Sequence, residues 1–135
     1  MIRVFLDTNI LVSASFWKGS SYQITMKIID GEILGFTTSE ILQEYRIVLK
    51  RDFDLSEEEI DKRVERLLEF LEIVSPTKSL DIIKDYPPDN KVLDGAVETR
   101  VDYIVTYDAK HLLKLKEFRG IKFVPPEEFL KILNK

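Results

Sequence analysis

The chain has 135 residues, about one domain's worth, and its 44% hydrophobic content is that of an ordinary globular protein. It has no cysteine and a single histidine, His111, which excludes disulfide scaffolds, thiol catalysis and multi-histidine metal sites within one chain. The net charge of −4, from 20 basic and 24 acidic residues, argues against a protein that coats nucleic acid by bulk electrostatics. We therefore expect a single folded domain over residues 1–135.

The N-terminal stretch is not typical of a signal peptide. It reads MIRVFLDTNILV, places Asp7 inside its apolar run and lacks a small-residue cleavage pattern. No apolar run approaches the roughly 18–20 residues needed to span a bilayer. The sequence thus predicts a cytoplasmic protein with no membrane partner.

In chain order, the sequence predicts short strands that alternate with helices. The strands are the apolar, β-rich runs at residues 2–6, 35–38, 73–74, 103–106 and 121–124. The helices follow helical spacing of apolar side chains near residues 10–17, 22–30, 39–49, 56–71, 80–83, 89–97, 110–115 and 125–133. Such alternation is typical of an α/β domain with a mainly parallel sheet.

Three helix starts carry a recognisable signal. Ser39 is the expected N-cap of the helix that follows the second strand. Ser56 and Glu59, three residues apart, form the capping-box pattern that opens the next helix. The two prolines at 125–126 are expected to begin the terminal helix.

Acidic residues follow or approach the predicted strand ends. In parallel α/β sheets the ligand crevice lies beyond the carboxyl ends of the strands, so polar residues there are candidate site residues. Asp7 directly follows the first strand and Asp108 follows the fourth, while Asp89 begins the helix that leads into the fourth. Each has a structural alternative, because Asp7 and Asp89 are good helix caps and Asp108 is a common turn residue.

Two further carboxylates lie on predicted helices. Glu44 comes three residues after Ile41 and four before Val48, so it flanks the apolar face of its helix. Because an unpaired buried charge is costly, Glu44 either forms a salt bridge at the helix edge or points into a cavity. Asp94 follows Asp89 by five residues, about 140° round the helix, and a solvated surface position suits it better.

A cluster of these carboxylates in one crevice would need compensation. Four acids held together repel one another, so either their pKa values rise or cations bind between them. With no cysteine and one histidine, all-oxygen ligation favours Mg²⁺ or Mn²⁺. Carboxylate-held ions of this kind suit phosphodiester hydrolysis, because they acidify a water and neutralise charge on the phosphate.

Four segments of the chain resemble PIN-domain ribonucleases, and above all the small VapC-like toxins of prokaryotic toxin–antitoxin pairs. They read FLDTNILVSA, TTSEILQEYRIVL, PDNKVLDGAV and DYIVTYDAKHLL, and begin at residues 5, 37, 88 and 102. The resemblance implies a three-layer α/β/α sandwich with a five-stranded, mainly parallel sheet, and metal-dependent cleavage of RNA. It also implies a homodimer and inhibition by a small antitoxin protein.

Residue by residue, the resemblance also implies a site. The acidic positions of the family fall on Asp7, Glu44, Asp89 and Asp108. The three aspartates would contact Mg²⁺ or Mn²⁺ directly or through water, and the glutamate would complete the ligand set or orient the attacking water. Residues expected to hold the carboxylates in place, or to lie at the fringe of the site, are Thr8, Asn9, Thr106 and Asp94.

The chain departs from the family pattern at one place. Relatives often carry extra acids just before the third acidic residue, where Tyr86, Pro87 and Pro88 stand here. This departure argues against a second strongly bound metal ion.

Other protein classes fit these residues less well. A phosphohydrolase of the haloacid dehalogenase type needs a second aspartate two residues after the first, where this chain has Asn9. A receiver domain needs a phospho-accepting aspartate after the third strand, where Ser75 and Pro76 follow. Two alternatives stay open: a PIN fold that only binds RNA within an assembly, and a nuclease that cuts DNA flaps.

Trp17 and Lys18 lie in the break between the first two predicted helices. They form either an exposed loop that grips RNA or a packing or oligomer contact.

Overall fold

The computed structural model of the chain describes residues 1–74, 90–108, 113 and 116–134, and for residues 90–94 it describes the backbone alone. In chain order the elements are β1 (Arg3–Leu6), α1 (Thr8–Phe16), α2 (Ser20–Ile29), β2 (Leu34–Thr38), α3 (Ser39–Phe53), α4 (Glu57–Leu68), β3 (Leu71–Val74), α5 (Asn90–Thr99), β4 (Tyr103–Val105), β5 (Glu117–Phe118), β6 (Ile121–Val124) and α6 (Pro126–Leu133).

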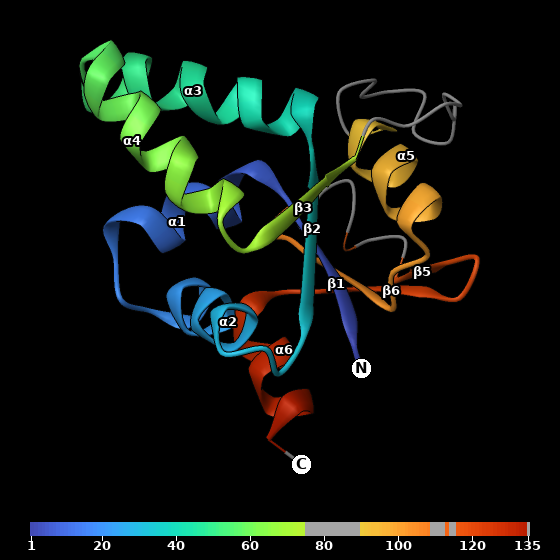
Figure 1. Ribbon diagram of the computed structural model, residues 1–135. Coiled ribbons are helices and arrows are strands. Elements are labelled where there is room, and N and C mark those ends of the chain that lie inside the picture. The colour runs from blue at the N-terminus through green and yellow to red at the C-terminus, as the bar shows by residue number, and fades with distance from the viewer. Residues whose placement is uncertain (75–89, 109–112, 114–115, 135) are drawn as a thin grey trace.

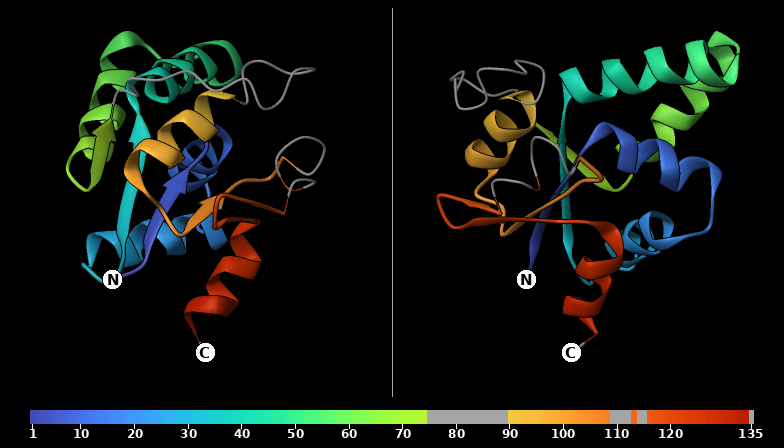
Figure 2. Two further views of the ribbon diagram at one scale, coloured as in Figure 1. Left: turned by 90° about the vertical axis from the view of Figure 1, so that its right-hand side faces the viewer. Right: turned by 180° about the vertical axis from the view of Figure 1, so that it is seen from behind.

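The strands form one sheet in the order β3-β2-β1-β4-β6-β5. All neighbouring strands are parallel except β5, which pairs antiparallel with β6. Helix α5 packs against β1, β2 and β3, and α1, α2 and α4 lie on the opposite side of the sheet (Figure 1). The right-hand view in Figure 2, from behind, shows the same layers, and α3 runs from the end of β2 over α1, beside α4. The predicted α/β/α sandwich is confirmed.

The sheet has six strands where five were expected. The additional strand, β5, has two residues and forms a hairpin with β6 through Arg119 and Gly120, whose φ angles are 51° and 83°. Two residues with positive φ are what a tight β-hairpin turn requires, and glycine adopts this conformation without steric cost. A two-residue strand carries too few side chains for an alternating pattern, so the sequence could not indicate it.

Several element ends differ from those predicted. Thr38, and not Ser39, caps α3: Thr38 is extended, and its hydroxyl accepts the N–H of Ile41 at 3.1 Å. Helix α4 ends at Leu68, so Leu71 belongs to β3. The capping box is confirmed, since the Ser56 hydroxyl accepts the Glu59 N–H and the Glu59 carboxylate accepts the Ser56 N–H.

Gly95 lets helix α5 pack directly against the sheet. A β-carbon at this position would come within 2.6 Å of the Phe5 ring and of the Thr38 methyl group. Phe5 is fully buried and pairs with Phe36 on one side and Ile104 on the other. The glycine therefore fixes the distance of α5 from the centre of the sheet.

Within the described part of the chain, none of the helices has both the length and the apolar character needed to cross a membrane. The predicted helix at 80–83, most of that at 110–115, and Asp89 fall outside the described residues.

Candidate active site

Asp7 lies where β1 ends and α1 begins, at the carboxyl edge of the sheet. Its Oδ1 accepts the backbone N–H of Thr8 at 2.7 Å, so Asp7 caps α1. Its Oδ2 accepts the hydroxyl of Thr106 at 2.7 Å. The two alternatives for Asp7, helix cap and site residue, are thus compatible, because each carboxylate oxygen has more than one lone pair to offer.

Thr106 connects the two strand-end aspartates. It is fully buried just after β4, and its backbone N–H donates to the Val124 carbonyl at 3.1 Å. Besides donating to Asp7, its hydroxyl oxygen accepts the backbone N–H of Asp108 at 3.0 Å. One side chain therefore orients the Asp7 carboxylate and the loop that carries Asp108.

Glu44 reaches the same place from α3. The hydroxyl of Thr8, which is buried, donates to Glu44 Oε2 at 3.2 Å. Glu44 itself is exposed, and among the described residues it forms no ion pair. The salt bridge considered for this residue is therefore not formed there, and its carboxylate lies beside the start of α1 instead.

The pKa of Asp7 is raised above its usual value. Burial of the carboxyl group is the main cause, and repulsion from Glu44 and Asp108 adds to it. The hydrogen bonds from Thr106 and Thr8 act in the opposite direction, because they stabilise the charged form. The surroundings of the Asp7 carboxylate therefore favour either its protonation or the binding of a cation next to it.

The remaining predicted site residues are not brought into this cluster by the described structure. Asp89, and the side chain of Asp94, lie outside the described residues. Asn9 is exposed, and among the described residues its side chain forms no hydrogen bond, so its supporting role stays a prediction.

The chemical type of the side chains in this cluster suits a hard divalent cation. Asp7, Glu44 and Asp108 offer carboxylate oxygens alone, and such ligands are typical of Mg²⁺ and Mn²⁺. Within the described residues, however, no three acidic, histidine or cysteine side chains are close enough together to hold a metal ion. A complete ligand set therefore needs Asp89 or a movement of these side chains.

Tyr107, which lies between Thr106 and Asp108, is not among the site residues that the sequence pattern predicts. The residue is 42% exposed, and its hydroxyl lies 3.2 Å from the hydroxyl of Ser21, a buried residue in the first turn of α2. Its position as an aromatic residue next to an aspartate that follows a strand is the sequence feature that could have indicated Tyr107 as a site residue.

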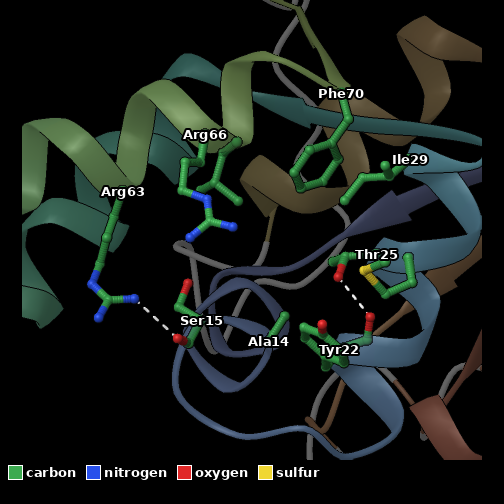
Figure 3. Close-up of a pocket in the computed structure, with 10 residues that line it drawn as sticks. Ala14, Ser15, Tyr22, Thr25, Ile29, Arg63, Arg66 and Phe70 are labelled. Carbon is green, nitrogen blue, oxygen red and sulfur yellow. Dashed lines mark hydrogen bonds between the residues drawn. The ribbon is translucent and has the colours of Figure 1, made fainter.

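A separate cavity of about 150 Å³ lies between α1, α2 and α4 (Figure 3). Tyr22, Arg66 and Phe70 are among its lining residues, and Arg63 donates to the Ser15 carbonyl at 2.9 Å along its wall. Of the candidate acids that the structure describes, Asp7, Glu44 and Asp108, none lines this cavity. It is therefore distinct from the carboxylate cluster.

The sequence model of the PIN domain matches residues 3–110. This chain belongs to the PIN-domain family. The matched range begins at β1 and ends just beyond Asp108, so this PIN domain contains all four predicted acidic positions, while β5, β6 and α6 follow it.

Solved structures share this fold. VapBC2 from Rickettsia felis, bound to a DNA fragment from its promoter, is 18% identical, with a TM-score of 0.66, 90% coverage of this chain and 97% of that one. A toxin–antitoxin complex from Klebsiella pneumoniae is 17% identical, with a TM-score of 0.64 and coverages of 91% and 97%. DNA-bound VapBC from Salmonella typhimurium is 16% identical, with a TM-score of 0.64 and coverages of 93% and 99%. At these identities the likeness establishes the PIN fold alone. No curated protein matches the sequence.

Proposed function

We propose that this PIN-domain protein is a Mg²⁺- or Mn²⁺-dependent endoribonuclease that hydrolyses RNA phosphodiester bonds, and that it is the toxin of a toxin–antitoxin pair. The observation that carries the proposal is the partly buried Asp7 carboxylate, held by Thr106 and Thr8 and repelled by Glu44 and Asp108. Membership of the PIN-domain family supports nuclease activity in general.

The metal would be held by the four acidic residues of the family pattern, Asp7, Glu44, Asp89 and Asp108. When bound, such an ion supplies an acidified water and neutralises charge on the attacked phosphate. The chain's own contribution is positioning. The Thr106 hydroxyl fixes the direction of Asp7 Oδ2, and the Thr8 hydroxyl does the same for Glu44.

The proposal includes protein partners as well as RNA. Structural relatives of this fold are toxin–antitoxin and VapBC complexes, which supports a small antitoxin as a partner. A homodimer of this chain belongs to the same proposal. Formation of a stable, stoichiometric complex with the product of an adjacent small gene, together with loss of cleavage in that complex, would support the toxin assignment.

The first test is cleavage of a mixed-sequence single-stranded RNA with Mn²⁺, Mg²⁺ or EDTA. We expect the wild type to cut only with metal, and Asp7→Asn and Asp89→Asn to be inactive. Asp61→Asn is the matched control, because Asp61 is an exposed aspartate on α4 whose partner is Arg46. Single-stranded and flap DNA substrates, run alongside, separate a ribonuclease from a DNA nuclease.

Two results would count against the proposal. Full metal-dependent cleavage by Asp7→Asn would remove Asp7 from the site. A folded wild type that binds RNA but neither cuts it nor binds Mn²⁺ would instead be an RNA-binding module.

A further inference from the structure

Two exposed aromatic side chains border the same turn. Among the large hydrophobic residues that are exposed in the described part of the chain, Trp17 and Tyr107 are the aromatic ones, with exposed fractions of 58% and 42%. Trp17 begins the turn between α1 and α2, and the Tyr107 hydroxyl reaches Ser21 at the other end of that turn. The segment from residue 17 to residue 21 therefore links the two rings.

Trp17 is held in place while it is exposed. Phe16 and Phe53 stack with their ring centroids 4.0 Å apart, and the Trp17 ring packs edge-on to both, at 6.0 and 6.1 Å. The Arg63 guanidinium lies 4.4 Å from the centroid of the Phe16 ring. A supported aromatic ring with more than half of its residue exposed is a ready surface for a second flat group.

Tyr107 places the second ring next to the carboxylates. It stands between Thr106, which bonds to Asp7, and Asp108. From Asp7, the nine residues of α1 carry the chain about 14 Å to the turn at Trp17. The Tyr107 ring thus lies beside the candidate site, and the Trp17 ring lies at a distance of about the length of α1 from it.

The charge at the turn suits an anionic chain. Lys18 is exposed directly after Trp17, and Arg63 lies behind Phe16. The negative charge of Asp52, next to Phe53, is paired with Arg51, whose guanidinium donates to it at 2.8 Å. Basic side chains interleaved with exposed aromatic rings are characteristic of proteins that bind single strands.

We infer that a single-stranded polynucleotide lies across Tyr107 and the α1–α2 turn, with bases stacked on Tyr107 and Trp17 and a phosphate near Lys18. This inference rests on the proposed function and makes it more specific. The substrate is bound as an unpaired strand, and the rings of Tyr107 and Trp17 form part of the surface that binds it. Stacking tolerates any base, since every base has a flat π face. A duplex cannot use these rings in this way, because its bases are already stacked on one another.

Trp17 provides a direct reporter, because it is the sole tryptophan of the chain. The wild type in EDTA, where metal-dependent cleavage is absent, is titrated with a short mixed-sequence RNA, with DNA of the same sequence, and with the RNA duplex. Base stacking is expected to quench Trp17 fluorescence saturably with both single strands, and the duplex is expected to have little effect. An RNA-selective response would assign contacts to the 2′-hydroxyl as well.

Ring-removing variants test the same surface by a second measurement. Fluorescence anisotropy of labelled single-stranded RNA should give a dissociation constant raised roughly five- to thirtyfold by Trp17→Leu and by Tyr107→Leu. Tyr107→Phe should keep wild-type affinity, because it retains the ring and loses only the hydroxyl contact with Ser21. Leu68→Ala is the control, since Leu68 is a half-exposed apolar residue on α4 without a ring.

The outcomes separate this inference from the nuclease proposal. If Mn²⁺-dependent cleavage occurs but both leucine variants keep the wild-type KM and affinity, the ribonuclease assignment stands and the stacking surface is wrong. If quenching and the affinity losses occur without cleavage, the surface stands and the nuclease assignment fails. If Trp17→Leu changes self-association or antitoxin binding but not RNA affinity, or if no polynucleotide binds, the inference is overturned.

Discussion

The hydroxyl of Thr106 donates a 2.7 Å hydrogen bond to Oδ2 of Asp7, across 99 residues of sequence. The bond joins the carboxyl ends of β1 and β4, which are neighbours in the sheet. The same hydroxyl accepts the N–H of Asp108, so both aspartates depend on it. Thr106 is therefore the residue whose loss should disturb the site without removing a carboxylate.

Thr106→Val tests this dependence. Valine keeps the shape of threonine but leaves the Asp108 N–H and the Asp7 carboxylate without their shared partner, so we expect unfolding free energy to fall by about 1–3 kcal/mol. Metal-dependent cleavage should fall about 10–100-fold, as when groups that orient metal ligands are removed. Urea unfolding and single-turnover cleavage measure the two effects.

The control for this variant is Thr37→Val. Thr37 is also fully buried, but its hydroxyl donates to the Leu6 carbonyl at 3.3 Å and not to a carboxylate. It should lower stability by a similar amount and leave cleavage by the folded protein unchanged. Equal activity losses in the two variants would mean that Thr106 acts only through stability.

Asp7→Asn should stabilise the metal-free protein near neutral pH. Burial, with repulsion from Glu44 and Asp108, raises the Asp7 pKa in the folded state, so the folded protein holds this proton more tightly than the unfolded chain does. The tighter binding of this proton by the folded state adds to the free energy of unfolding. That gain is complete at a pH below the pKa of 3.8 in the unfolded chain, and it is lost as the pH rises through the raised pKa of the folded state. The variant carries no charge and avoids this loss.

Urea unfolding in EDTA at neutral pH and near pH 4 measures whether Asp7→Asn is more or less stable than the wild type. The stability advantage of Asp7→Asn should be clear at neutral pH and should shrink as the pH falls toward 3.8. A variant that is less stable than the wild type at neutral pH would show that the hydrogen bonds of the carboxylate outweigh its burial and repulsion.

Mn²⁺ should raise the unfolding temperature of the wild type. A ligand that binds only the folded state at 100 times its dissociation constant adds about 2.7 kcal/mol, which corresponds to roughly 5–10 °C for a domain of this size. Asp7→Asn should respond much less, and Asp61→Asn should respond like the wild type. Equal shifts in all three proteins would place the metal elsewhere.

Thr8 variants test the link to Glu44. Thr8→Ser keeps the hydroxyl that donates to Glu44 Oε2 and should retain most activity. Thr8→Val removes it, and we expect about a tenfold loss of cleavage because the Glu44 carboxylate is no longer oriented. If both variants lose activity equally, the methyl packing of Thr8 matters and its hydroxyl does not.

Gly95→Ala should destabilise the fold through α5. The new methyl group would lie 2.6 Å from both the Phe5 ring and the Thr38 methyl group, and such overpacking costs about 1–3 kcal/mol. Gly19→Ala is a useful contrast, because in the described part of the chain no atom beyond its two sequence neighbours lies within 4 Å of the added methyl group. Only a helix-cap preference of at most about 1 kcal/mol is affected. A harmless Gly95→Ala would mean that α5 can move away from the sheet.

Local patterns predicted most of the elements. The capping box at Ser56 and Glu59 needs only three residues of spacing, and the apolar spacing of α3 buries Ile41, Tyr45 and Leu49 as expected. The predictions are wrong where a local sequence pattern is very short or where two neighbouring residues fit the same role equally well. Two adjacent hydroxyl residues could each cap α3, and β5 was too brief to show a period.

By itself, the sequence determined the alternation of strands and helices and the position of Asp7 and Asp108 just after strands, because these depend on residues close together in the chain. Only the tertiary structure decided that β1 lies between β2 and β4, that Thr106 bonds to Asp7, and that Tyr107 reaches Ser21. Strand order and register depend on contacts between distant segments. A periodic pattern identifies the buried face of each element but does not specify its neighbour.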